Sequence, residues 1–270
     1  MMEGVKDMEQ ASSKNDISLV VKHLQKSFLR GRKKILTDIN LAASSGECIG
    51  ILGANGCGKS TLLSILAGIQ KADSGSCLIN GRTFISAPKN KRHRPFLVSQ
   101  MDKQACPPSS LLRRNKKAAW DDIAYVPQEC PLIEELNALD NLRLWYCSSP
   151  LSLEKELDNG FLAMLGIPDF LKVAVKNMSG GMKKRLSIGC ALAKDPNVLL
   201  LDEPGAALDL ICKERIEVYL KHYKSKGNII LLTTHEEREI MLCDRVFILK
   251  GGTLSPLEYD GNIHQLASKI

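Results

Sequence analysis

A glycine-rich turn early in the chain has the residue types needed to hold a chain of phosphates. Residues 53–60 read Gly-Ala-Asn-Gly-Cys-Gly-Lys-Ser. Glycines let the backbone wrap so that successive N–H groups point inward, and a helix beginning near Lys59 adds the positive end of its dipole. In this spacing Lys59 reaches the outer phosphates and the Ser60 hydroxyl can bind Mg²⁺. We therefore expect nucleotide contacts from Gly53, Ala54, Asn55, Gly56, Cys57, Gly58, Lys59, Ser60 and Thr61.

Two adjacent acids and a histidine further along could act on a bound phosphate. Asp202 and Glu203 follow the apolar run 198–201, and His235 follows the apolar run 229–232. An acid at the end of a buried strand can hold Mg²⁺, and its neighbour can act as a general base for water. We expect these two roles for Asp202 and Glu203, with His235 at the terminal phosphate. Taken alone, the acid pair could equally lie in an ordinary turn.

These residues lie at the ends of predicted strands and helices that alternate along the chain. Short apolar runs predict strands at residues 17–21, 35–42, 48–52, 77–79, 123–126, 198–201, 229–232 and 246–249. Apolar residues every three or four positions predict helices at 59–67, through much of 136–188, at 208–223 and at 236–243. Strands that alternate with helices favour an α/β fold with a largely parallel sheet, and the helical middle, about 130–190, reads as an inserted subdomain.

The composition is that of a globular protein with one strongly basic segment. The chain has 270 residues, 44% hydrophobic and 25% charged, and a formal charge of +7. Residues 88–117 hold nine Lys or Arg against one Asp, together with four prolines. We expect an inserted, solvated loop here, and contact with anionic lipid headgroups is the alternative. Nucleic acid is not an expected partner, because only Phe96 interleaves with these charges.

Targeting features and cysteines point to a cytosolic protein. No apolar run is long enough for a membrane span, so we predict none. Residues 1–16 lack the apolar core of a secretory signal and are expected to form a flexible tail. The nine cysteines are scattered and never form Cys-x-x-Cys, which favours reduced thiols.

A second glycine motif carries a family resemblance. Residues 177–186 read Asn-Met-Ser-Gly-Gly-Met-Lys-Lys-Arg-Leu and resemble the signature motif of ABC transporter ATP-binding proteins. The other motifs of that family are present in the usual order, namely the turn 53–60, Val126-Pro-Gln128, Asp202-Glu203, Ala207-Leu-Asp209 and His235. The resemblance spans about residues 17–254. It implies one ABC ATPase domain over 17–270: a P-loop α/β core, an N-terminal antiparallel β portion and the helical subdomain.

The resemblance also implies roles for residues whose chemistry is not evident alone. By its place in the family pattern, Phe28 stacks on the adenine of ATP. Gln128 links Mg²⁺ and the attacking water to the membrane partner, and Asp209 communicates between two ATP sites. The second phosphate clamp, which acts on ATP held by another subunit, is Ser179, Gly180, Gly181 and Met182.

The chain departs from the family pattern at the signature motif and after the acid pair. Met178 and Met182 stand where Leu and Gln are usual, and Gly205 and Ala206 stand where hydroxyl residues are usual. Met182 removes an amide, which puts the clamp's polar contacts in doubt. The signature motif and the basic residues that follow it look most like those of the drug and peptide exporter branch. The other motif residues match, so we expect hydrolysis to survive.

The function implied is that of an ATPase subunit that dimerises around two ATP and drives export through a separate membrane permease. With one set of motifs, the second nucleotide-binding subunit must be another chain, identical or different. The permease is expected to dock near 129–147, which places the protein on the cytoplasmic face of the membrane. Alternatives are a soluble ABC ATPase outside transport and an ATP-binding regulator with little hydrolysis. A GTPase is disfavoured, because the guanine-reading Asn-Lys-x-Asp motif is missing.

Overall fold

The structure is a computed structural model, and it describes residues 17–29, 31–86, 122–206 and 208–258. The expected tail 1–16, the basic segment 88–117 and Ala207 lie outside these residues. Within the described ranges, no helix is both long enough and apolar enough to cross a bilayer.

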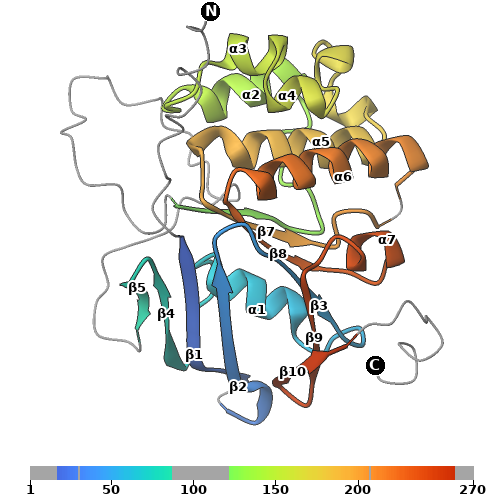
Figure 1. The fold of residues 1–270 in the computed structure, drawn as a ribbon. Coiled ribbons are helices and arrows are strands. Elements are labelled where there is room, and N and C mark those ends of the chain that lie inside the picture. The colour runs from blue at the N-terminus through green and yellow to red at the C-terminus, as the bar shows by residue number, and fades with distance from the viewer. Residues whose placement is uncertain (1–16, 30, 87–121, 207, 259–270) are drawn as a thin grey trace, which may run out of the picture.

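Ten strands form one continuous sheet (Figure 1) in the order β5-β4-β1-β2-β10-β9-β3-β8-β7-β6. They are β1 (Ser18–Phe28), β2 (Lys33–Ser44), β3 (Cys48–Leu52), β4 (Ser74–Ile79), β5 (Arg82–Ser86), β6 (Ile123–Val126), β7 (Val198–Asp202), β8 (Ile229–Thr233), β9 (Arg245–Lys250) and β10 (Thr253–Leu257). Strands β6, β7, β8, β3 and β9 pair in parallel, whereas β5, β4, β1 and β2 pair antiparallel. The expected combination of a parallel core and an antiparallel N-terminal portion is confirmed.

Helices cover both faces of the parallel part of the sheet. In Figure 1, α1 (Lys59–Leu66) lies on one side, and α5 (Gly180–Ala191) and α6 (Leu210–Ser225) lie on the other. The short helix α7 (Glu237–Ile240) follows β8. Between β6 and α5 the chain forms α2 (Ala138–Tyr146), α3 (Leu153–Asp158), α4 (Phe161–Met164) and the 3₁₀ turns Pro168–Phe170 and Val175–Asn177. These elements occupy the stretch predicted to be helical.

The alternating side chains of β7 show how the sheet separates two cores. Leu199 and Leu201 belong to the apolar cluster that contains residues of α5 and α6. Val198 and Leu200 belong to the other cluster, with residues of α1. Successive side chains of a strand point to opposite faces, so a strand covered on both faces must be apolar throughout. This is why β7 and β8 are continuous apolar runs.

The pattern of apolar runs predicts the buried strands well and the exposed ones poorly. The predicted bounds 48–52 and 123–126 are those of β3 and β6. β5 and β10 were not predicted, and helix α7 ends at Ile240, earlier than the predicted residue 243. β5 is paired only with β4 at the edge of the sheet, and β10 is mostly exposed.

Candidate functional site

The glycine-rich turn, here called the phosphate loop (53–60), joins β3 to α1, and two of its glycines leave no room for a side chain. Gly53 has φ 153° and Gly58 has φ 115°. A Cβ on Gly53 would lie 2.6 Å from the carbonyl oxygen of Leu249, and one on Gly58 would lie 2.6 Å from Cγ2 of Ile35. The loop therefore lies against β2 and β9 in a shape that side chains would prevent.

Lys59, the first residue of α1, is buried inside the phosphate loop. Its Nζ donates hydrogen bonds to the carbonyl oxygens of Gly53 (2.7 Å) and Ala54 (3.3 Å). It also lies 3.0 Å from Nε2 of His235. Because an ammonium group can only donate, Nε2 accepts this hydrogen bond and the ring proton is on Nδ1. Lys59 and His235, whose roles the sequence predicts separately, are thus in direct contact.

His235 is held in its neutral form. Burial, and secondarily the positive charge of Lys59, lowers the pKa of its imidazole, while Glu203 opposes that shift. Nε2 lies 3.8 Å from Oε1 of Glu203. With the ring neutral, this is a contact between an imidazole and a carboxylate and not an ion pair. One ring nitrogen therefore faces both the lysine and the acid.

Glu203 has an unusual backbone conformation, with φ 47° in the left-handed region. Its N–H donates to two oxygens of Thr233 in β8, the backbone carbonyl oxygen and Oγ1, each at 3.1 Å. Oγ1 of Thr233 in turn donates to Oδ1 of the buried Asp202 at 2.6 Å. The turn separates the two adjacent acids, because Asp202 bonds within the sheet while the Glu203 carboxylate accepts from Nε2 of Gln128 at 3.1 Å.

The oxygen donors of the site suit Mg²⁺, which prefers carboxylate, hydroxyl and phosphate ligands. Asp202 offers a carboxylate and Gln128 an amide oxygen, both at the carboxyl ends of neighbouring strands β7 and β6. Ser60 is exposed in the first turn of α1, so its hydroxyl is accessible. Oδ1 of Asp202 accepts one hydrogen bond from Thr233, and Oδ2 accepts one from the Tyr125 hydroxyl at 3.4 Å. Each oxygen therefore keeps a lone pair for a metal ion. The chemistry of this donor set fits the metal.

The remaining loop residues and the proposed adenine contact are accessible. Ala54, Asn55 and Gly56 are exposed, while Cys57 and Thr61 are half-buried. Phe28 lies at the end of β1, and the Lys26 ammonium is 5.3 Å from its ring centroid. Phe28 is 38% exposed, so part of its side chain is accessible to a ligand.

The predicted second clamp forms a separate cluster at the starts of α5 and α6. Ser179 caps α5, with Oγ accepting from the Met182 N–H at 3.2 Å, and a Cβ on Gly180 would meet open space. Asp209 caps α6 in the same way through the Cys212 N–H at 2.8 Å. A Cβ on Gly181 would lie 2.5 Å from Sγ of Cys212 and 3.7 Å from Oδ2 of Asp209. The signature turn and Asp209 are therefore neighbours.

Met182 does not project freely from this cluster. Its side chain is half-buried and packs against the apolar cluster around α5 and α6. The residue that replaces the family's usual glutamine thus contributes to the core.

Lys184 is a residue of the site that the sequence prediction missed. It is 4% exposed, and its Nζ donates to the carbonyl oxygens of Pro127 (3.0 Å), Gln128 (3.4 Å) and Asp202 (3.2 Å). Burial lowers the pKa of this amine, and nearby acids oppose the shift. Lys184 thereby ties α5 to the ends of β6 and β7. The only signal in the sequence is the basic run after the signature, where Lys183 instead reaches Glu134 at the surface.

Comparisons with known proteins show the family of the chain. The family described as ABC transporter matches residues 36–206. The taurine import ATP-binding protein TauB of Pseudomonas aeruginosa is 33% identical over 224 residues, which cover 82% of this chain and 73% of TauB. The lipopolysaccharide export system ATP-binding protein LptB of Escherichia coli K12 is 30% identical over 241 residues, or 88% of each chain. These relatives include both an importer and an exporter component.

A solved structure shares the fold over nearly its whole length. The dimeric structure of a post-hydrolysis state of the ATP-binding cassette MJ0796, bound to ADP and Pi, superposes with a TM-score of 0.69 and 25% sequence identity. The match covers 89% of this chain and 98% of that one. On the family match, the relatives and this fold, the chain belongs to the ABC transporter family as an ATP-binding ATPase subunit.

Proposed function

We propose that this chain hydrolyses ATP as one of two nucleotide-binding subunits and drives a separate membrane permease in export. One observation carries the hydrolytic part of the proposal. Lys59, His235, Glu203 and Gln128 come from four separate segments, and contacts of 3.0, 3.8 and 3.1 Å join them in series. A phosphate-binding lysine, a neutral histidine and a candidate general base are thereby in one place.

The contacts of Lys59 suggest what ATP binding changes. In the structure the Lys59 ammonium is satisfied by two loop carbonyls and by His235. The outer phosphates are stronger partners for an ammonium, because the hydrogen bonds are then between full charges. ATP would draw Lys59 from His235 and leave Nε2 free. Once Lys59 has left, the ring can take the tautomer that is protonated at Nε2, and this N–H would donate to the terminal phosphate.

Glu203 is proposed as the general base for the attacking water. Its carboxylate is only partly buried and accepts a hydrogen bond from Gln128. A carboxylate within reach of a water in line with the terminal phosphate can accept its proton as the oxygen–phosphorus bond forms. Asp202, Ser60 and Gln128 would hold Mg²⁺, which when bound neutralises charge on the phosphates.

Pairing of two nucleotide-binding subunits is supported by the cluster at the start of α5. Ser179 and Gly180 are exposed at a helix N-terminus, and Gly180 faces open space. An exposed helix start offers N–H donors to a phosphate that this chain does not itself hold. We propose that Ser179, Gly180, Gly181 and Met182 close over ATP in a second subunit, with Asp209 beside them. Phe28 would stack on the adenine.

Docking of the permease is proposed at 129–147, on the cytoplasmic face of the membrane. Leu144 of α2 is 40% exposed there, although most large apolar side chains of the described residues are buried. Export, as opposed to import, rests on the resemblance of the signature to the exporter branch. Lipid contact through 88–117 is a further proposal, which the charge of that segment motivates.

Steady-state ATP hydrolysis across a series of protein concentrations tests the proposal. The full chain should show turnover that rises faster than linearly with concentration, because each site needs two subunits. Glu203→Gln should lose at least about 100-fold in kcat, the loss expected when a general base is removed. This variant should also form an ATP-bound dimer in light scattering. Glu214→Gln is the control, because it removes the same charge from an exposed residue of α6.

Two results would contradict the proposal in different ways. Turnover that is linear in concentration and unaffected by Glu203→Gln would exclude the composite site. ATP binding without turnover in the wild type would favour the regulatory alternative.

A further inference from the structure

The hydroxyl of Thr233, the last residue of β8, lies between the two adjacent acids of the site. The residue is fully buried. Its Oγ1 donates to Oδ1 of Asp202 at 2.6 Å and accepts from the backbone N–H of Glu203 at 3.1 Å. Both contacts are made by the side chain, in addition to the pairing of β8 with β7. One hydroxyl therefore contacts the candidate metal ligand and the residue proposed as the general base.

The two partners of this hydroxyl fix the direction of its proton. A threonine hydroxyl has one donor position and two acceptor positions. The Glu203 N–H can only donate and an ionised Asp202 carboxylate can only accept, so the hydroxyl proton points to Asp202. The Oγ1–Oδ1 distance of 2.6 Å is that of a hydrogen bond to a charged oxygen, which is about twice as strong as one between neutral groups.

This hydrogen bond is the stronger of two that hold the Asp202 carboxylate. The second comes from the Tyr125 hydroxyl, which lies 3.4 Å from Oδ2. Asp202 is 2% exposed, so bulk water has little access to replace a lost partner. Without the Thr233 hydroxyl, the carboxylate would keep only the longer bond and could turn about its χ2 angle.

We infer that Thr233 is a positioning residue for Mg²⁺, because its hydroxyl sets the orientation of the Asp202 carboxylate. The inference rests on the metal role proposed for Asp202. Groups that hydrogen-bond to a metal ligand orient it, and their loss weakens metal binding or activity about 10- to 100-fold. Glu203 would keep its bond to the Thr233 carbonyl oxygen when that side chain changes, so the metal contact is the one at stake.

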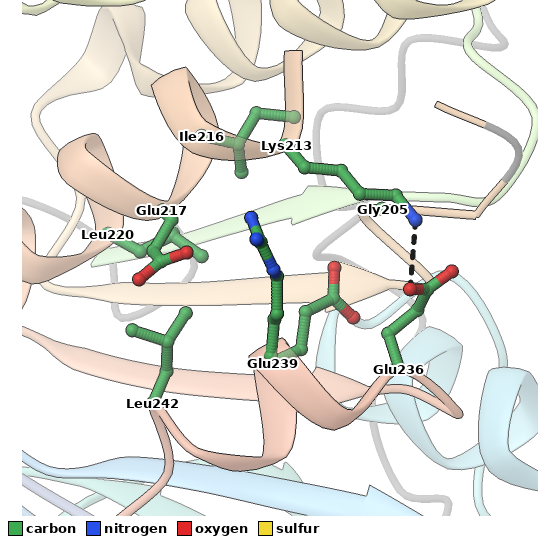
Figure 2. A pocket seen from close by; sticks show the side chains of 9 residues that line it. Gly205, Lys213, Ile216, Glu217, Leu220, Glu236, Glu239 and Leu242 are labelled. Atoms are coloured by element: carbon green, nitrogen blue, oxygen red, sulfur yellow. Dashed lines mark hydrogen bonds and ion pairs between the residues drawn. The ribbon is translucent and has the colours of Figure 1, made fainter. Parts of the chain in front are cut away.

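The next residue along the chain, Thr234, provides a matched control. It is also buried, and its Oγ1 accepts from the backbone N–H of Glu236 at 2.8 Å. Glu236 forms an ion pair with Lys213 beside a small cavity between α6 and α7, which the buried Glu239 also lines (Figure 2). The hydroxyl of Thr234 is thus bonded toward α7, whereas that of Thr233 is bonded toward the acids.

Calorimetric binding of a non-hydrolysable ATP analogue to the full chain, with Mg²⁺ and with EDTA, tests the inference. The ratio of the two affinities measures what the metal contributes. Thr233→Val keeps the size of the side chain and loses the hydroxyl. Its ratio should fall about tenfold, with the affinity in EDTA within about twofold of wild type, and its kcat should also fall about tenfold. Thr234→Val should keep the wild-type ratio.

A second pair of variants separates the hydrogen bond from packing. Thr233→Ser and Thr233→Cys both lose the methyl group, but serine keeps a strong donor whereas a thiol is a weak one. The serine variant should retain the ratio, and the cysteine variant should lose it as Thr233→Val does. Equal losses in the two would show that the methyl group matters and would overturn the inference.

The binding experiment also distinguishes this inference from the proposed function, because it needs no hydrolysis. If the wild type binds the analogue more tightly with Mg²⁺ and a Thr233→Val chain, folded by circular dichroism, does so equally, the inference is wrong and the proposed function stands. If Mg²⁺ does not change the affinity of the wild type, the metal role of Asp202 fails, and the inference fails with it.

Discussion

Strain at single residues identifies the site as clearly as its polar contacts do. Glu203 is one of five non-glycine residues with positive φ in the described chain, and it is the one whose side chain contacts Gln128 and His235. Such a conformation persists only where surrounding bonds hold it, and here the two contacts to Thr233 do so. The sequence predicts the acid pair, but the turn that separates the two acids depends on β8, which lies far along the chain.

The glycines of the phosphate loop give a prediction about stability at this scale. Gly58→Ala should lower the free energy of unfolding by about 2–4 kcal/mol, because both its φ of 115° and the 2.6 Å approach to Ile35 oppose a Cβ. Gly56→Ala should cost only about 1 kcal/mol, since its φ is 77° but a Cβ there meets nothing within 4 Å. Urea unfolding without nucleotide measures both. Equal losses would show that backbone conformation alone sets the cost.

At the scale of elements, three consecutive basic residues of α5 have three different environments. Lys183 pairs with Glu134 at the surface, Lys184 binds carbonyls at the ends of β6 and β7, and Arg185 donates to the carbonyl oxygen of Leu165 at 2.8 Å. Helical geometry turns each by about 100°, so one faces solvent while two face the protein. The sequence shows only a basic run, and it cannot say which member is buried until the packing of α5 on the sheet is known.

Lys184→Met should therefore affect stability and turnover together. Removing the ammonium leaves three carbonyl oxygens with fewer partners, which should lower the free energy of unfolding by about 1–3 kcal/mol. The kcat should fall as well, because Gln128 and Asp202 lose a shared anchor. Lys183→Met is the matched control and should change stability by less than about 1 kcal/mol. Similar losses in both variants, by urea unfolding, would contradict the anchor role.

The strands that the sequence does not predict are those that are not buried on both faces. A strand covered on both faces must be apolar throughout, and β3, β7 and β8, which are buried at every position, can be recognised from the sequence for that reason. β10 is exposed and contains Pro256, and its pairing with β9 is set by a two-glycine turn rather than by burial. The contacts of Lys59, Glu203 and His235 follow from strand order, which no single motif contains.

For the whole molecule, Glu239 should make folding stability depend on pH. Its pKa is about 7 in the folded state, against 4.5 for the unperturbed group. Between these values the folded chain binds a proton that the unfolded chain has released, so stability falls as pH rises from 5 to 7 and then levels off. The full effect is on the order of 3 kcal/mol as an upper bound. Urea unfolding at pH 5, 6, 7 and 8 should show this slope.

The comparison with Glu239→Gln isolates this contribution, because every other titrating group is common to both proteins. The difference in unfolding free energy between wild type and variant should shrink or change sign across pH 5 to 7. A constant difference would mean that the carboxyl group titrates alike in the folded and unfolded chains.

The strand order also has a consequence for synthesis. β8 lies between β3 and β7, yet residues 229–233 leave the ribosome after both of them. A nascent chain that ends before Ile229 has two apolar strands with no partner between them, and unpaired strand edges are prone to aggregate. It also lacks His235 and the Thr233 oxygen that holds Glu203. The chain can therefore become able to hydrolyse ATP only after residues 229–235 are made, and premature termination before residue 229 should yield insoluble protein rather than a weaker enzyme.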